Sequence, residues 1–222
     1  MKIIAKIYND YNEKFGIPRQ SGLAGEMKSV IVFESEYRDE NALRGIEEFS
    51  HLWLIWKFSE CEEGKWRPTV RPPRLGGNRR IGVFATRSPF RPNPIGLSSV
   101  KLVEVKKTED RGTVLVVSGA DLKNMTPIYD IKPYIAYTDS HADAVCGFAD
   151  KAFGYSIEVR CPEEILEIVD KERQSALLNA LKNDPRPAYQ NDERAYFFSF
   201  GEYEVEFKVR DGVLNIEKIV KN

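Results

Sequence analysis

The stretch GLSSVKLVEVKKTEDRGTVLVVSG (96–119) contains two strand-like segments, 96–107 and 112–119, on either side of the turn sequence EDRG. Short runs of apolar and β-branched residues that flank a glycine-containing turn predict a β-hairpin. The residues around the hairpin predict more strands, at 1–8, 27–34, 51–58, 81–85 and 128–137, and a short helix capped by Asp39 through DENALRGIEEF (39–49). Six or seven strands with few helices predict a mainly β fold, a small antiparallel barrel or curled sheet.

The composition changes after Asp143. Pro162 and the acidic residues after it predict the start of a helix that ends before Pro185. Three further strands are predicted at 194–200, 202–209 and 213–220. We therefore expect two domains, a β domain over residues 1–143 and a small C-terminal α+β domain over residues 155–222.

Composition excludes several classes of protein. Of the 222 residues 42% are apolar and 30% are charged, and no apolar run approaches the roughly 20 residues that span a bilayer. The N-terminus has no signal-peptide pattern, so we expect a cytoplasmic protein without a membrane partner. With two histidines and three cysteines that lack CxxC spacing, we expect neither a metal site nor a histidine-based catalytic triad.

The charge is unevenly distributed. The chain carries a net charge of −1, yet residues 65–91 contain eight Lys and Arg residues and no acidic one. Such a tract predicts contact with RNA phosphates, although a solvated charged loop has the same composition. The candidate RNA-binding residues are Arg71, Arg74, Arg79, Arg80 and, in the C-terminal domain, Arg186. Arg186 lies between two prolines, where it could equally belong to a turn that ends a helix.

The sequence RSPFRPNPIGL (87–97) ends the basic tract. Three prolines restrict its backbone and that of each preceding residue, so the loop holds its side chains in place without help from a helix or sheet. Arg87 and Arg91 then present planar groups that suit a carboxylate or a phosphate. A rigid connector with solvated arginines is the alternative.

Several segments together resemble one known family, the TsaA-like, TrmO-type RNA methyltransferases. The segments are FGIPRQ (15–20), FSHLWLIWKF (49–58), GVFATRSPFRPNPIGLS (82–98), DLKNMTPIYDIKPY (121–134) and DPRPAYQ (184–190). The resemblance implies a single-sheet β-barrel of non-Rossmann type, S-adenosylmethionine as methyl donor, and a homodimer. The implied substrate is the tRNA adenosine just 3′ of the anticodon, which already carries a threonylcarbamoyl group and is methylated on its 6-amino nitrogen.

The same resemblance implies the residues that bind the donor. They are Pro18, Arg19, Gln20, Ser59, Glu60, Arg87, Leu97, Asp121, Leu122, Lys123 and Asn124. In one place the chain departs from the family, which commonly has an acidic residue and a glycine before the TP dipeptide where this chain has Asn124 and Met125.

The implied chemistry selects further candidates. The lone pair of a carbamoylated nitrogen is delocalised, so a general base within hydrogen-bonding reach should assist its attack. Asp130 is the candidate base and Lys132 its orienting neighbour, because both lie on one face of a strand. Arg91 is the candidate partner of the threonyl carboxylate, with Asn93 beside it.

Two other classes of function compete with a methyltransferase: a non-catalytic RNA-binding barrel, and a regulatory protein that senses the donor. The second, distant loop FGIPRQ favours the enzyme, since a plain RNA-binding barrel does not need it.

Overall fold

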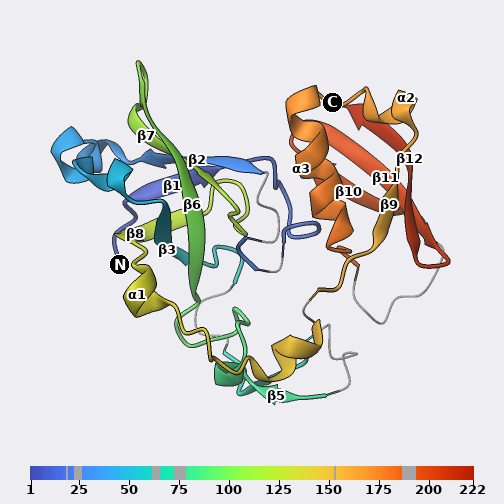
Figure 1. The fold of residues 1–222 in the computed structure, drawn as a ribbon, viewed down its shortest axis with the longest axis horizontal. Helices are drawn as coiled ribbons and strands as arrows, with labels where there is room; N and C mark the ends of the chain where they lie inside the picture. Colours follow the sequence, from blue (N-terminus) through green and yellow to red (C-terminus); the bar gives the residue numbers. More distant parts are fainter. Residues whose placement is uncertain (19, 23–26, 62–65, 73–78, 153, 187–193) are drawn as a thin grey trace.

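Two β-sheets dominate the molecule, and they lie side by side (Figure 1). The structure is a computed structural model that describes residues 1–18, 20–22, 27–61, 66–72, 79–152, 154–186 and 194–222. The prediction of a mainly β protein with few helices is confirmed. Within the described residues, no helix is long and apolar enough to cross a membrane.

The first sheet is a closed barrel of six antiparallel strands in the order β1-β2-β7-β6-β3-β8. Its strands are β1 (Ala5–Tyr8), β2 (Lys28–Phe33), β3 (His51–Lys57), β6 (Ile95–Thr108), β7 (Gly112–Ser118) and β8 (Pro127–Pro133). The pairing of Ala5 with Ile128 joins β1 to β8 and closes the barrel. In β3, Leu52, Leu54 and Trp56 point inward while the residues between them face outward, as the period of a strand requires.

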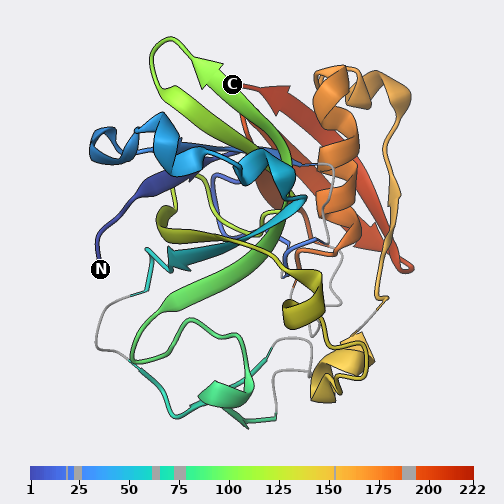
Figure 2. The same ribbon diagram turned by 60° about the vertical axis from the view of Figure 1, so that its left-hand side comes forward.

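The predicted hairpin at 96–119 supplies two adjacent strands of this barrel, β6 and β7. Residues 95–101 of β6 pair with β3, and residues 101–108 pair with β7. The 14-residue strand therefore crosses from one neighbour to the other, and its far half extends beyond the barrel with β7 (Figures 1 and 2).

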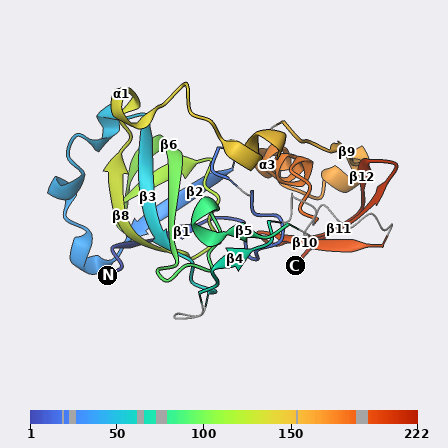
Figure 3. The same cartoon turned by 90° about the horizontal axis from the view of Figure 1, so that it is seen from below.

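Local structure differs from the predictions at three places. Only Ile81–Gly82 of the predicted strand 81–85 is extended, as β5, and it pairs with β4 (Thr69–Val70) in a ribbon on the underside of the molecule (Figure 3). The strand predicted at 128–137 ends at Pro133, and the short helix α1 (Ala136–Asp139) follows. The helix predicted after Asp39 is instead two 3-10 turns, Glu40–Leu43 and Ile46–Glu48, separated at Gly45, whose φ is 86°.

The C-terminal domain is a four-stranded sheet with a helix across one face (Figures 1 and 3). The sheet has the order β10-β11-β12-β9, with β9 (Glu158–Arg160), β10 (Tyr196–Phe200), β11 (Tyr203–Arg210) and β12 (Val213–Lys221). The helix predicted from Pro162 to Pro185 is divided into α2 (Glu163–Leu166) and α3 (Lys171–Lys182). At the break, the Gln174 side chain donates hydrogen bonds to the carbonyls of Leu166 and Val169, at 3.1 and 2.9 Å.

Each sheet has its own apolar core, but the second core contains residues from the first half of the chain. Tyr11 and Met27 are buried in the C-terminal core, and Phe15 and Ile17 pack against it. The connection between β1 and β2 therefore leaves the barrel and enters the C-terminal domain.

Candidate functional site

Three segments of the barrel domain meet beside one another: the β1–β2 connection, the loop that leads into β6, and the β7–β8 connection. The amide of Gly22 donates to the carbonyl of Gly119 at 2.8 Å. Arg87 donates to the side-chain oxygen of Gln20. Ser98 donates to Asp121 at 2.5 Å. Gln20 and Arg87, two predicted donor-binding residues, are thus in contact although they are 67 residues apart in the chain.

Asp121 ends a chain of hydrogen bonds that begins inside the barrel. The indole of Trp56 donates to Ser98 Oγ at 2.9 Å, and Ser98 Oγ donates to Asp121 Oδ1. Burial raises the pKa of Asp121, while hydrogen bonding from Ser98 and the nearby charge of Arg87 act in the opposite direction. Ser98 and, behind it, Trp56 thus hold the carboxylate of Asp121 in place near the positive charge of Arg87.

Gly96 allows this chain to form. A Cβ atom at position 96 would lie 2.2 Å from Cε2 of Trp56, far inside van der Waals contact. Gly96 and Trp56 are paired across β6 and β3. The indole of Trp56 therefore lies in the space that a side chain at position 96 would fill.

We expect Gly96→Ala to lower the free energy of unfolding by about 1–3 kcal/mol, as overpacking of a well-packed core does. Gly82→Ala is the control, because its Cβ would have no neighbour within 4 Å. Urea unfolding of the two variants measures the difference. Equal, small losses for both would contradict the close packing of Trp56 on Gly96.

We expect Asp121→Asn to change how stability depends on pH. Because burial raises the pKa of Asp121 in the folded state, the folded chain keeps this proton to a higher pH than the unfolded chain does. The contribution of Asp121 to the stability of the wild type is therefore lost as pH rises from about 4, the unfolded value, through the folded pKa. Asparagine has no proton to lose. Urea unfolding at several pH values should show the variant gaining on the wild type as pH rises, whereas a constant difference would contradict the raised pKa.

Glu60 forms ion pairs with two of the three segments, the β7–β8 and β1–β2 connections. It pairs with Lys123 of the β7–β8 connection, and with Lys14 of the β1–β2 connection at 3.1 Å. Hydrogen bonding from Lys123 above all lowers the pKa of Glu60, with Lys14 adding to it and partial burial opposing it. Ser59, which precedes Glu60 and was also predicted to bind the donor, is exposed just after the end of β3.

The residues 122–125 hold the β7–β8 connection against the barrel and the β1–β2 connection. The side chain of Leu122 is in the barrel core, and Asn124 accepts from the backbone of Asn9 at 3.2 Å. Met125 has φ of 63°, in the left-handed region. That conformation gives a physical reason for a glycine at this position, so methionine here carries backbone strain.

The proline-rich loop is braced by Arg91. Its Nη1 donates to the carbonyls of Val83 and Thr86, at 3.1 and 2.6 Å, and its guanidinium lies 5.4 Å from the centre of the Phe84 ring. One guanidinium nitrogen of this predicted carboxylate-binding residue is thus committed to the loop itself. Asn93 is exposed nearby on the same loop.

Asp130 and Lys132 form an ion pair on β8, with 2.7 Å between Oδ2 and Nζ. Ile55 of β3 is paired with Leu97 on one side and with Asp130 on the other. Leu97, which is 56% exposed, and Asp130 therefore lie in one row on the outer face of the barrel. The candidate base is thus separated from Leu97, a predicted donor contact, by the width of β3. It is not a member of the hydrogen-bond chain of Trp56, Ser98 and Asp121.

The basic tract is exposed where the structure describes it. Arg71, Arg79 and Arg80 are exposed, and Arg80 donates to Thr69 at 3.2 Å across the β4–β5 ribbon. The predicted residues Arg19 and Arg74 lie outside the described residues.

The prediction for Arg186 has to be corrected. Its side chain is 8% exposed, and Nε lies 2.9 Å from Oδ1 of Asp184. A second bond joins Nη2 to Oδ2 at 3.0 Å, and Tyr155 donates to the same carboxylate at 3.0 Å. A guanidinium enclosed with its carboxylate cannot reach a phosphate, so Arg186 has a structural role.

Three residues of the site were missed by the sequence analysis: Lys14, Trp56 and Ser98. Ser98 had a signal, since it is a polar residue at an inward position between Gly96 and Val100. Lys14 had none, because only the fold brings it to Glu60. Among the described residues, no group of three His, Cys, Asp or Glu side chains could hold a metal ion.

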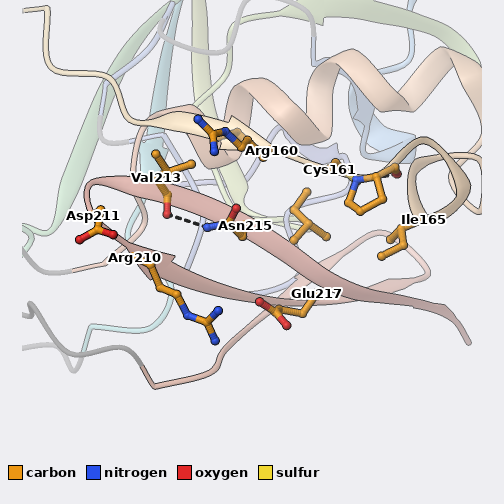
Figure 4. A pocket seen from close by; sticks show the side chains of 11 residues that line it. Arg160, Cys161, Ile165, Arg210, Asp211, Val213, Asn215 and Glu217 are labelled. Carbon is orange, nitrogen blue, oxygen red and sulfur yellow. Dashed lines mark hydrogen bonds between the residues drawn. The ribbon is translucent and has the colours of Figure 1, made fainter.

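A cavity of about 820 Å³ lies elsewhere, on the C-terminal domain between β9, the start of α2 and β12. Figure 4 shows that its charged side chains do not all converge on one point; they are Arg160, Arg210, Asp211 and Glu217. Arg160 pairs with Glu158 at 2.7 Å. We therefore assign the functional site to the three converging segments and not to this cavity.

Comparison with known proteins identifies the family. The model of the tRNA-methyltransferase O N-terminal domain matches residues 6–140, and that of the TrmO C-terminal domain matches residues 155–222. The chain belongs to the TrmO family. The tRNA (adenine(37)-N6)-methyltransferase of Escherichia coli K12 is 41% identical over 94% of this chain and 92% of its own length.

Other relatives agree with the TrmO assignment. A putative S-adenosylmethionine-dependent methyltransferase RcsF of Pseudomonas aeruginosa is 41% identical over 86% of this chain and 83% of its own. Among solved structures, TrmO from P. aeruginosa superimposes with a TM-score of 0.79 at 31% identity, covering 99% of this chain and 95% of that one.

Proposed function

We propose that this protein transfers a methyl group from S-adenosylmethionine to the 6-amino nitrogen of a tRNA adenosine just 3′ of the anticodon, which already carries a threonylcarbamoyl group. The observation that supports this most is the convergence of Gln20, Arg87 and Asp121 from three segments, in a member of a family of tRNA methyltransferases. The barrel of residues 1–143, a single sheet of non-Rossmann type, is the proposed catalytic domain, and residues 155–222 are a second domain.

The charges of the site suit the proposed donor, which supplies an electrophilic methyl group on a sulfonium and also carries a carboxylate, an ammonium and two ribose hydroxyls. Arg87 is a cation for the carboxylate, and the half-buried Asp121 is an acceptor for hydroxyl or ammonium groups. The full proposed set is Pro18, Arg19, Gln20, Ser59, Glu60, Arg87, Leu97, Asp121, Leu122, Lys123 and Asn124.

The outer face of the barrel carries the proposed acceptor chemistry. Asp130 accepts the proton of the carbamoylated nitrogen, and Lys132 holds that carboxylate at 2.7 Å. Arg91 binds the threonyl carboxylate with the nitrogens that do not brace the loop, and Asn93 donates beside it. Holding the reactants in line is the larger part of the catalysis in this scheme.

We further propose that the protein works in the cytoplasm as a homodimer, and that the exposed arginines of the basic tract contact tRNA phosphates. The proposed contacts are Arg71, Arg74, Arg79 and Arg80.

We expect the triple variant Arg71→Ala, Arg79→Ala, Arg80→Ala to weaken tRNA binding and to flatten its salt dependence. Each lost phosphate contact reduces the slope of log K against log salt concentration by ~0.7–0.9. Filter binding at several salt concentrations measures the slope. The matched control neutralises three exposed basic residues elsewhere on the barrel, Arg44, Lys107 and Arg111. A slope that changes as little in the triple variant as in the control would contradict the proposed contacts.

The test of the function is methyl transfer to tRNA with and without the threonylcarbamoyl group, read by mass spectrometry of the nucleosides. The expected product is the methylated form of the threonylcarbamoyl nucleoside, formed only on the modified tRNA and only with donor. Donor binding without any transfer would point to a sensor, and tRNA binding without donor binding to a plain RNA-binding barrel; either result overturns the proposal.

A further inference from the structure

The segment from residue 10 to residue 17, here called the docking segment, lies between the proposed donor site and the C-terminal domain. It follows β1 of the barrel, yet Tyr11 forms an antiparallel bridge with Phe200 at the edge strand β10. The segment therefore extends the edge of the C-terminal sheet, and it runs directly into Pro18 and Gln20 of the donor site.

Aromatic rings hold the docking segment on this domain. The ring of Phe15 is parallel to those of Tyr196 and Phe207, with 6.3 Å between centroids in each pair. Gly16 has φ of 93°, and a Cβ there would lie 2.0 Å from Cε2 of Phe198. The backbone at Gly16 thus touches an aromatic ring of β10, which only a glycine permits.

Polar contacts also join the docking segment to the C-terminal domain. The amide of Gly201 donates to the carbonyl of Asp10 at 2.7 Å, and the amide of Ser199 donates to Glu13 at 2.9 Å. Asp10 also lies 3.4 Å from the guanidinium of Arg173 on α3. These bonds fix the backbone of the segment as well as its side chains.

The other side of the docking segment touches the donor site. The amide of Asn124 donates to the carbonyl of Tyr11 at 2.7 Å, and Lys14 pairs with Glu60. Tyr11 itself is 1% exposed, and among the described residues its hydroxyl has no hydrogen-bond partner. Burial, and then the carboxylates of Asp10 and Asp121, raise its pKa, so Tyr11 is close to the acid of the donor site.

We propose that the C-terminal domain positions the methyl-donor site, by holding residues 10–17 on β10 so that Pro18 and Gln20 meet Arg87 and Asp121. Phe15 and Gly16 are positioning residues in this scheme, because they act through the neighbours that touch the donor. The inference rests on the proposed function, since it assigns the C-terminal domain a part in donor binding. A segment fixed on both sides loses less conformational entropy when a ligand binds, which favours affinity.

The test compares variants that open the docking contacts with a variant that damages the same domain elsewhere. Phe15→Ala and the milder Phe15→Leu remove the stacked ring. Leu214→Ala is the control, because Leu214 is fully buried in the same core but pairs with β9 and β11 on the far side of the sheet from β10. All are measured as full chains below the lowest melting temperature of the set.

Isothermal titration with S-adenosylmethionine and with its demethylated product gives the binding constants, and steady-state kinetics on modified tRNA separates KM from kcat. We expect Phe15→Ala to raise the donor Kd and donor KM about tenfold or more, Phe15→Leu to lie between, and kcat at saturating donor to stay close to that of the wild type. Hydrogen exchange should increase in residues 10–17. Leu214→Ala should bind the donor as the wild type does.

The outcomes distinguish the two proposals. If the wild type binds the donor and Phe15→Ala binds it equally well, or if Leu214→Ala weakens binding as much as Phe15→Ala does, the positioning role is overturned while the enzyme assignment stands. If the wild type itself does not bind the donor, the proposed function fails, and the positioning role fails with it.

Discussion

Asp130→Asn is expected to lower kcat by ~10²–10⁴-fold, the range that a general base contributes, while the donor Kd stays that of the wild type. Asparagine keeps the size and one carbonyl oxygen but cannot accept the proton of the carbamoylated nitrogen. The ion pair with Lys132 is on the outer surface of the barrel, with side chains 43% and 62% exposed for Asp130 and Lys132. Its loss therefore has a small effect on stability, so a fall in turnover would report on chemistry and not on folding.

The control for Asp130 is Glu104→Gln, which neutralises an exposed carboxylate on the far half of β6. Single-turnover methylation of modified tRNA at saturating donor separates the chemical step from product release. Near-normal turnover of Asp130→Asn with normal donor binding would exclude Asp130 as the base. Asp121 would then be the next carboxylate to test, because burial already raises its pKa.

The barrel could be predicted from the sequence where the signal is local. The alternation in β3 and the hairpin of β6 and β7 depend on neighbouring residues, and both are present in the structure. The segment 81–85, IGVFA, was predicted as a strand. In the structure only two of its residues find a partner strand, and the following 3-10 turn Val83–Ala85 is bridged by the side chain of Arg91.

The candidate site was less predictable, because its contacts join residues that are far apart in the chain. Lys123 and Glu60 are 63 residues apart, and nothing local to either shows that they will pair. The family resemblance supplied Asp121 and Arg87, and the fold then places Ser98 and Trp56 behind the carboxylate. The docking segment is the clearest case, since Tyr11 and its bridge partner Phe200 on β10 are 189 residues apart.

Arg186 shows the opposite error, in which a local pattern suggests exposure and the fold buries the residue. Arginine next to proline occurs both in RPNP (91–94) and in DPRP (184–187). Arg91 in the first braces a loop and stays partly exposed, whereas Arg186 in the second lies beneath the surface with Asp184 and Tyr155. The two differ in what the fold places around them, which the prolines do not encode.

Arg186→Ala is accordingly expected to lower the free energy of unfolding by about 3–5 kcal/mol, the loss typical of removing one partner of a buried ion pair. The variant removes the two-bond guanidinium contact and leaves the buried carboxylate of Asp184 with the weaker donors Tyr155 and the amide of residue 186. Differential scanning calorimetry should show a large decrease in melting temperature. Arg111→Ala removes an exposed arginine and should change stability by less than about 0.5 kcal/mol.

The double variant Asp184→Asn, Arg186→Met separates the charge from the packing. With both charges removed, no ion is left buried without a partner, so part of the lost stability should return. Asparagine also tolerates the left-handed conformation at position 184, where φ is 47°. If Arg186 were instead a tRNA contact, Arg186→Ala would weaken tRNA binding at temperatures where the protein is fully folded, and the double variant would bind as weakly as the single one. We expect neither, because an enclosed guanidinium contributes to RNA affinity only through the stability of the domain that encloses it.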